Sequence, residues 1–99
     1  MQMVPLTKLV TVGPGLVPVQ LLGSDSNRRL VEFRDTGLVS GSNICPGANF
    51  DPTFVMFSLS NTTILHFDYD KWGPYVTGEW WCLTAGGVGK IAVYCWHWA

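Results

Sequence analysis

The sequence predicts an all-β protein, a single-domain antiparallel β-sandwich or jelly-roll-like fold with roughly seven to eight short strands. Helical spacing of apolar residues is never sustained over several turns, and short runs rich in Val, Ile, Phe, Tyr and Trp recur along the chain. Gly, Pro, Asn and Asp separate these runs. Because 99 residues suffice for one hydrophobic core, we expect one domain over residues 1–99.

The candidate strands are the apolar runs themselves. They cover residues 8–12, 17–22, 29–34, 38–40, 53–59, 62–69, 79–85 and 90–98. The segments 23–27 and 35–37 predict turns, because Asp, Asn and Ser side chains hydrogen-bond to nearby backbone and glycine adopts positive φ. Segment 45–52 predicts a loop, because its two prolines cannot join a central ladder.

Segment 70–78 is a further predicted loop, and it carries Trp72 and Tyr75. Two of the predicted strands show period-2 alternation, which gives each of them one face toward the core and one wetter face. In residues 28–34 the core face holds Val31 and Phe33, and the wetter face holds Arg28, Leu30, Glu32 and Arg34. In residues 63–70 one face holds Leu65, Phe67 and Tyr69, and the other holds His66, Asp68 and Asp70.

The last 22 residues hold four of the five tryptophans and two of the three cysteines. Glycines at 86, 87 and 89 favour a tight turn, so we expect a hairpin of residues 79–85 and 90–98. One face would hold Trp80, Cys82, Ile91, Val93 and Cys95, and the other Trp81, Leu83, Tyr94, Trp96 and Trp98. Both faces are apolar, and a partner sheet covers only one, so we expect a second chain to cover the other.

The composition argues against charged partners. Charged residues make up 13% of the chain, about half the usual fraction, and the net charge is -1. No long-range field draws such a molecule to nucleic acid or to an anionic membrane, and we expect neither as a partner. The amino-terminal segment is broken by Pro5, Pro14 and Pro18 and has no basic region. It predicts neither a signal peptide nor a membrane helix, so we expect synthesis in the cytoplasm.

Cysteine and histidine are candidate metal ligands and nucleophiles. Cys45, Cys82, Cys95, His66 and His97 lack the spacing of zinc sites. In the expected hairpin Cys82 lies nearest Val93 and Cys95 nearest Trp80, which predicts buried thiols. Cys95 and His97 would lie roughly 7 Å apart on one strand face, too far for a nucleophilic pair. We expect no metal, no cofactor and no catalytic residue.

Three acidic residues, Asp68, Asp70 and Glu79, offer two further alternatives, a calcium site or a glycosidase carboxylate pair. Paired carboxylates alone specify neither of these sites. Aspartates at the end of a strand more often cap a turn or lie on a solvated face. We therefore expect turn capping or a solvated face.

The order of three motifs resembles the small β-sandwich proteins of tailed bacteriophage particles, which serve as capsid decoration or head-fibre components. The motifs are an early TVG…VQLL strand, SNRRLVEFRDTG, and the end GPYVTGEWWCLTAGGVGKIAVYCW. They match that family's Asn-Arg-Arg before an apolar strand, its Asn/Asp-x-Gly turn, and its Gly-Pro and Gly-Glu-aromatic segment before the final strand. The resemblance spans most of the chain.

The resemblance implies a non-enzymatic virion protein, made in the host cytoplasm, that binds the outer capsid surface and stabilises the shell. Its partner would be the major capsid protein or another virion protein, and a homo-oligomer, such as a trimer, is expected. The low charge and many aromatic residues agree with burial by assembly. The alternative is a tail- or fibre-associated carbohydrate-binding or receptor-binding module that stacks Trp72, Tyr75, Trp96 and Trp98 on sugars.

The expected interface combines the aromatic residues with the basic pair. Its members are Trp72, Tyr75, Trp81, Tyr94, Trp96, Trp98, Arg28 and Arg29. By themselves Arg28 and Arg29, with Arg34 further along the chain, predict a small basic spot that faces solvent or pairs with Asp25, Glu32 or Asp35. The resemblance makes them a polar contact to a capsid subunit.

Overall fold

The computed structural model describes residues 2–13, 17–36, 42–47, 57–59, 64–84 and 88–98, and these residues form eight strands and two short helices. The elements are β1 (Met3–Val12), β2 (Val19–Leu22), β3 (Arg28–Asp35), β4 (Ser42–Pro46), β5 (Phe57–Leu59), β6 (Ile64–Asp68), α1 (Tyr69–Trp72), α2 (Pro74–Thr77), β7 (Trp80–Thr84) and β8 (Gly89–Trp98). The predicted all-β class is confirmed. No helix among the described residues is long and apolar enough to cross a membrane.

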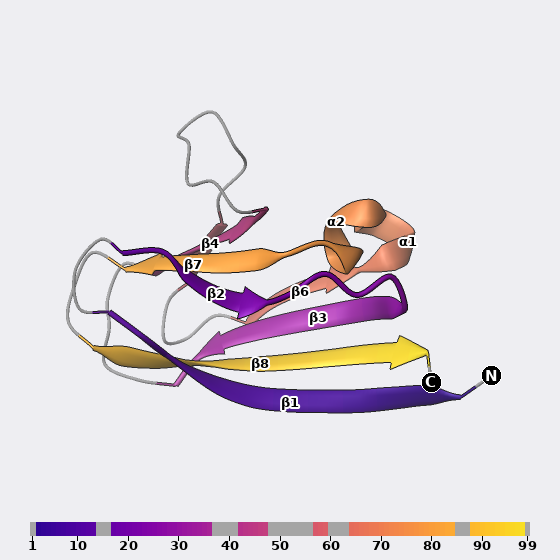
Figure 1. Cartoon of the computed structure of the whole chain (residues 1–99), viewed down its shortest axis with the longest axis horizontal. Coiled ribbons are helices and arrows are strands. Elements are labelled where there is room, and N and C mark those ends of the chain that lie inside the picture. The colour runs from indigo at the N-terminus through magenta and orange to yellow at the C-terminus, as the bar shows by residue number, and fades with distance from the viewer. Residues whose placement is uncertain are drawn as a thin grey trace.

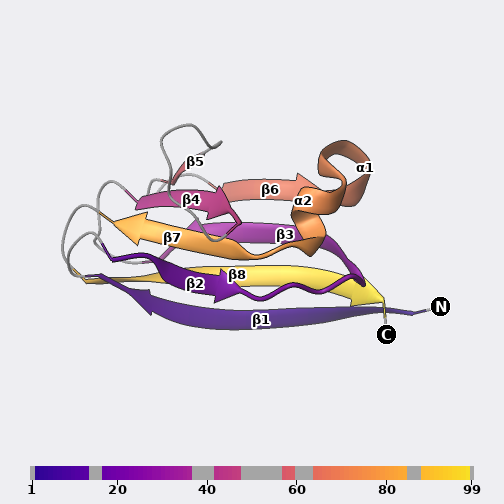
Figure 2. The same cartoon turned by 45° about the horizontal axis from the view of Figure 1, so that its top comes forward.

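Two four-stranded sheets pack face to face, which confirms the predicted sandwich (Figures 1 and 2). Sheet A has the strand order β1-β8-β3-β6, and sheet B has the order β2-β7-β4-β5. Every ladder in both sheets is antiparallel. The helices α1 and α2 lie together at one end of the sandwich, next to the ends of β6 and β3.

The expected hairpin of the last two strands is wrong. Strand β7 pairs with β2 and β4 in sheet B, whereas β8 pairs with β1 and β3 in sheet A. The predicted neighbours Cys82 and Val93 therefore lie in different sheets. The chain crosses between the sheets here, because each strand is central in its own sheet and has two other neighbours. Residues 86 and 87 of the expected turn 86–89 lie outside the described residues, as does residue 85 of the strand predicted before it.

Several element boundaries also differ from the predicted ones. Strand β1 begins at Met3, five residues before the expected start at Lys8, and β4 occupies part of the predicted loop 45–52. The predicted strand 38–40 lies outside the described residues, as do residues 53–56 of the strand predicted at 53–59. The predicted loop 70–78 contains α2 and all of α1 except Tyr69, which was predicted to end the preceding strand.

The core is an aromatic cluster between the sheets. The Trp80 ring lies 5.1 Å from that of Phe33 and 4.9 Å from that of Phe67. Phe57 and Trp72 extend the cluster toward the helices, with ring distances to Phe67 of 4.7 and 5.2 Å. Large apolar side chains that meet across both sheets exclude water from the middle of the sandwich.

Two β-bulges change which side chains point inward. In β2 the register shifts between Gln20 and Leu22, and Leu21 and Leu22 are both buried. In β3 the register shifts between Arg28 and Leu30, with Arg28 opposite His97 and Leu30 opposite Trp96. An extra residue reverses the alternation beyond it. The bulge therefore turns Arg28 into the molecule.

Candidate binding face

The outer face of sheet A is the surface we consider as a candidate binding site. In Figures 1 and 2 sheet B covers the inner face of sheet A, and no described element lies over its outer face. Alternation confirms which side chains point outward, because Val31 and Phe33 are fully buried in β3 while Leu30, Glu32 and Arg34 are not. The outer face is therefore available to a partner or ligand.

Strand register arranges the outward side chains in rows across the sheet. The central row is Thr7, Tyr94, Glu32 and His66, from β1, β8, β3 and β6 in turn. The next row is Leu9, Ala92, Arg34 and Ile64, and the row on the other side is Pro5, Trp96, Leu30 and Asp68. These rows alternate polar and apolar groups on one continuous surface.

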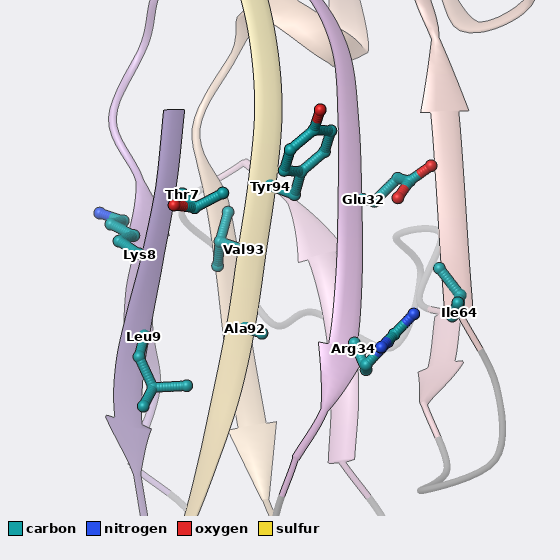
Figure 3. Close-up of a pocket in the computed structure, with 9 residues that line it drawn as sticks. All are labelled: Thr7, Lys8, Leu9, Glu32, Arg34, Ile64, Ala92, Val93 and Tyr94. Atoms are coloured by element: carbon teal, nitrogen blue, oxygen red, sulfur yellow. The ribbon is translucent and has the colours of Figure 1, made fainter. Parts of the chain in front are cut away.

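A groove of about 530 Å³ lies on this face, over the central row and the Ala92 row. Its lining residues are Thr7, Lys8, Leu9, Glu32, Arg34, Ile64, Ala92, Val93 and Tyr94 (Figure 3). Figure 3 shows the short side chain of Ala92 between the larger side chains of Leu9 and Arg34. A small residue in the middle of a row of larger ones leaves room on the sheet.

The Glu32–His66 pair is a short polar contact of the groove region. His66 Nδ1 lies 2.7 Å from Glu32 Oε1, and His66 Nε2 lies 3.9 Å from Asp68 Oδ2. Both side chains of the shorter pair are partly exposed, so the pair contributes little to stability. It does fix the direction of a carboxylate beside the Tyr94 ring, because Glu32 and Tyr94 are opposite each other in the ladder.

The aromatic side chains of β8 continue this surface toward the end of the strand. Tyr94 and Trp96 point outward two residues apart, with ring centroids 5.9 Å apart and planes at 79°. Both rings are half-buried, and Trp98 follows in the same alternation. The three form a ridge along β8, which we call the β8 ridge.

The predicted interface residues do not lie on one surface. Tyr94, Trp96 and Trp98 belong to the outer face of sheet A, whereas Trp81 is in β7 of sheet B. The face expected to combine Trp81 with the β8 ridge is therefore divided between the two sheets. This follows directly from the crossing of the chain between them.

Trp72 and Tyr75 lie near each other at the helical end. They line a small apolar cavity of about 30 Å³ with Pro46, Phe57 and Trp80. Trp72 packs edge-on against Phe57, at 5.5 Å between ring centroids, whereas Tyr75 is exposed. The sugar-stacking platform expected from Trp72, Tyr75, Trp96 and Trp98 is thus divided as well, because Trp72 belongs to the rim of the core.

Arg28 is buried, contrary to the expectation that it faces solvent. Its Nη1 donates to the carbonyl oxygens of Val76 at 3.1 Å and Gly78 at 2.9 Å, and its Nη2 donates to Gly23 O at 2.7 Å. Carbonyl acceptors around a planar guanidinium compensate for the loss of hydration. Arg28 therefore holds the turn before β3 against the segment that leads into β7.

Arg29 keeps a partly exposed position. Its Nη1 donates to Ser26 O and Arg28 O, each at 2.9 Å, and its guanidinium lies 4.5 Å from the centre of the Tyr69 ring. None of the acidic partners expected for the basic pair is among these contacts. The two neighbouring arginines thus have different surroundings, one internal and one at the surface.

The cysteines are buried, as predicted. Burial, and secondly the nearby Asp35 carboxylate, raise the pKa of the Cys82 thiol to about 12. Burial also raises the pKa of the Cys95 thiol, although Arg28 acts in the opposite direction. A thiol that stays protonated is a poor nucleophile. Within the described part of the chain no three His, Cys, Asp or Glu side chains gather as a metal site would require.

The three acidic residues occupy separate positions. Asp68 caps α1, where its Oδ1 accepts a hydrogen bond from Lys71 N at 2.9 Å, and this confirms the expected capping role. Asp70 lies in the first turn of α1, so the prediction that it shares a strand face with Asp68 is wrong. Glu79 accepts a hydrogen bond from Gln20 Nε2 at 2.8 Å.

Of the residues that line the groove, sequence reasoning named only Tyr94 as a site residue. Glu32, its partner His66, and Ala92 are instructive among those missed. Alternation placed Glu32 and His66 on the wetter faces of their strands, but only the β3–β6 register brings them together. Ala92, a small residue among bulky neighbours in an apolar strand, was the available signal for a hollow.

Comparisons with known proteins found no matching family model, no matching curated protein and no matching solved structure.

Proposed function

We propose that this protein is a non-enzymatic structural protein of a bacteriophage virion, which binds the outer capsid surface through the outer face of sheet A and stabilises the shell. One observation carries the choice of surface. The β8 ridge places half-buried Tyr and Trp side chains on a sheet face that no described element covers. Tyr and Trp are enriched in protein interfaces, where the ring is buried and its polar atom finds a partner.

Two further features support the proposal. The order of turn and strand motifs resembles small virion sandwich proteins, and the low charge suits a protein whose surface is buried by assembly. A protein that binds the assembled shell in preference to free subunits stabilises the shell by mass action. Many copies acting in this way raise the temperature at which the shell opens.

The test uses phage particles produced without this protein. We expect the purified chain to cosediment with them and to raise their thermal stability. Trp96→Glu should weaken binding by at least about tenfold, because a charge would be buried in the interface. Trp81→Glu is the matched control, since Trp81 is also a half-buried residue of a central strand, but in sheet B.

Three outcomes would count against the proposal. If the protein fails to cosediment with the particles at every concentration tested, the virion role is rejected. Equal loss of binding in both tryptophan variants, or in neither, would remove the outer face of sheet A as the docking surface. Urea unfolding of each variant shows first that it is folded.

A carbohydrate-binding role is the second candidate, and the groove favours it. Sugar sites combine an aromatic ring with a few oriented polar groups, and here Tyr94 stands beside the Glu32–His66 pair and Arg34. Oligosaccharides released from the surface of the host bacterium would serve as the probe. Binding should shift the NMR signals of the groove and be lost in Tyr94→Ala but kept in Tyr75→Ala. If no oligosaccharide binds, the carbohydrate-binding role is rejected and the virion role is the one that remains.

A further inference from the structure

Strand β1 is one edge of sheet A, and it is long and exposed. It spans ten residues, and β8 is its one neighbour among the described residues. Leu6 and Leu9 are 45% and 55% exposed. A long edge strand with exposed apolar side chains is a ready template for another strand.

The direction of each backbone group on β1 follows from two hydrogen bonds of β8. Trp98 N donates to Asn27 O at 2.9 Å, and Lys90 O accepts from Thr36 N at 3.0 Å, both on the side of β3. Neighbouring residues of a strand direct their backbone groups to opposite sides. The even-numbered residues of β8 therefore face β3, and the odd-numbered residues face β1.

The β1–β8 register then assigns the two sides of β1. Odd-numbered β8 residues lie opposite Val4, Leu6, Lys8, Val10 and Val12, so these five direct their backbone groups to β8. Met3, Pro5, Thr7, Leu9 and Thr11 direct theirs to the open edge. Pro5 has no N–H group, but its backbone faces the open edge, so the β1–β8 ladder loses no hydrogen bond. From Thr7 to Thr11 the open edge has a full set of donors and acceptors.

We propose that β1 pairs with β1 of a second copy of this chain, antiparallel and about a two-fold axis that passes beside Leu9. Such an axis stands perpendicular to the sheet, so outward side chains meet outward side chains. With Leu9 on the axis, the exposed Leu9 side chains of the two copies pack together and Thr7 lies opposite Thr11. Threonine pairs and apolar pairs are favourable cross-strand neighbours.

Neighbouring registers are less favourable. An axis at Lys8 would place the two Lys8 ammonium groups opposite each other, and Lys8 is the only charged residue of β1. An axis at Thr7 would place Pro5 opposite Leu9, where the missing N–H leaves a carbonyl without its donor. The axis at Leu9 avoids both the pair of lysines and the carbonyl without a donor, and it places Lys8 opposite Val10. The complementarity of β1 with itself is the reason to choose a second copy over an unrelated strand.

The opposite edge of sheet A, strand β6, is a less favourable edge for strand pairing. Strand β6 spans five residues and carries His66 and Asp68. Charged, short edges resist strand addition. Pairing through β1 would join the two A sheets into one and bring together the grooves that Thr7 and Leu9 line. This inference does not depend on the proposed virion function.

Analytical ultracentrifugation of the purified chain over a range of concentrations tests the proposal, with a monomer–dimer equilibrium expected. Leu9→Lys puts two like charges beside the axis and should raise the dissociation constant at least about tenfold. Ile64→Lys is the matched control, because Ile64 shares the outward row with Leu9, is 47% exposed and lies on the β6 edge. It should leave the dimer intact.

Two independent measurements protect against a variant that merely fails to fold. Thr7→Pro removes an N–H at the open edge without touching the β1–β8 ladder, and it should also dissociate the dimer. In the wild type, hydrogen exchange at the amides of Leu9 and Thr11 should slow as concentration rises, whereas Lys8 and Val10 should be protected at all concentrations.

A wild-type chain that is monomeric or trimeric throughout would overturn the proposal. Dissociation by Ile64→Lys instead of Leu9→Lys would also overturn it, by moving the contact to β6. A monomeric Leu9→Lys variant that still cosediments with phage particles would support strand pairing and leave the virion role standing. Loss of cosedimentation in Trp96→Glu, with the dimer intact, would separate the two surfaces.

Discussion

Strands β7 and β8 have similar compositions and opposite surroundings. Both carry tryptophan and cysteine on alternating positions, and both are central strands. In β7 the inward Trp80 is 1% exposed and lies at the middle of the aromatic core, whereas in β8 the tryptophans point outward and are half-buried. Trp81, the neighbour of Trp80 in β7, points outward and is half-buried like the tryptophans of β8. Tryptophan therefore has two roles here, which are distinguished by the face of the sheet and not by the residue type.

The largest difference is expected between Trp80→Ala and Trp96→Ala. Trp80→Ala removes a buried ring in contact with Phe33 and Phe67 and should lower the free energy of unfolding by about 3–5 kcal/mol. Trp96→Ala should lower it by less than about 1.5 kcal/mol, because the ring is half-exposed. Urea unfolding measures both values. Equal losses would mean that the β8 ridge belongs to the core.

A smaller difference is expected between the two arginines at the start of β3, of which Arg28 is bonded to the segment before β7. Arg28→Lys loses the planar fork that holds three carbonyl oxygens and should cost about 2–3 kcal/mol. Arg29→Lys should cost about 1 kcal/mol or less, since its contacts are at the surface. Thermal unfolding followed by circular dichroism compares the variants. A larger effect at Arg29 would contradict the internal position of Arg28.

A further effect concerns the Cys82 thiol of β7 and is confined to high pH. The pKa of Cys82 is raised from 9.0 to about 12, so between these values the unfolded chain loses a proton that the folded chain keeps. The contribution of this thiol to stability is full below pH 9 and is lost progressively as the pH rises toward 12. Cys82→Ala should flatten this decline in urea titrations at several pH values. An unchanged slope would mean that Cys82 is not its source.

Alternation within a strand was predictable, whereas pairing between strands was not. Val31 and Phe33 could be placed in the core because their period of two is visible in the sequence. The crossing between β7 and β8 was missed, because apolar residues on both faces fit a hairpin and two central strands equally well. A glycine-rich connection between the strands does not distinguish them either.

The candidate site was less predictable than the fold. Arg28 and Arg29 look alike in sequence, and the bulge that turns one inward depends on the pairing of β3 with β8. The Glu32–His66 contact joins residues 34 positions apart, so it required the β3–β6 register. Trp72 appeared to lie on an exposed loop, but two helical turns place it against Phe57 and Phe67.

The pairing of Met3 with Trp98 brings the amino-terminal and carboxyl-terminal strands together at one end of sheet A (Figure 1). A short glycine-serine linker from residue 2 to residue 98 would close the backbone into a ring without crossing either face of the sandwich. Circular permutants opened at an existing connection should therefore fold. For the same reason the whole sandwich can be inserted into a surface loop of a host protein, with the two ends of that loop kept side by side.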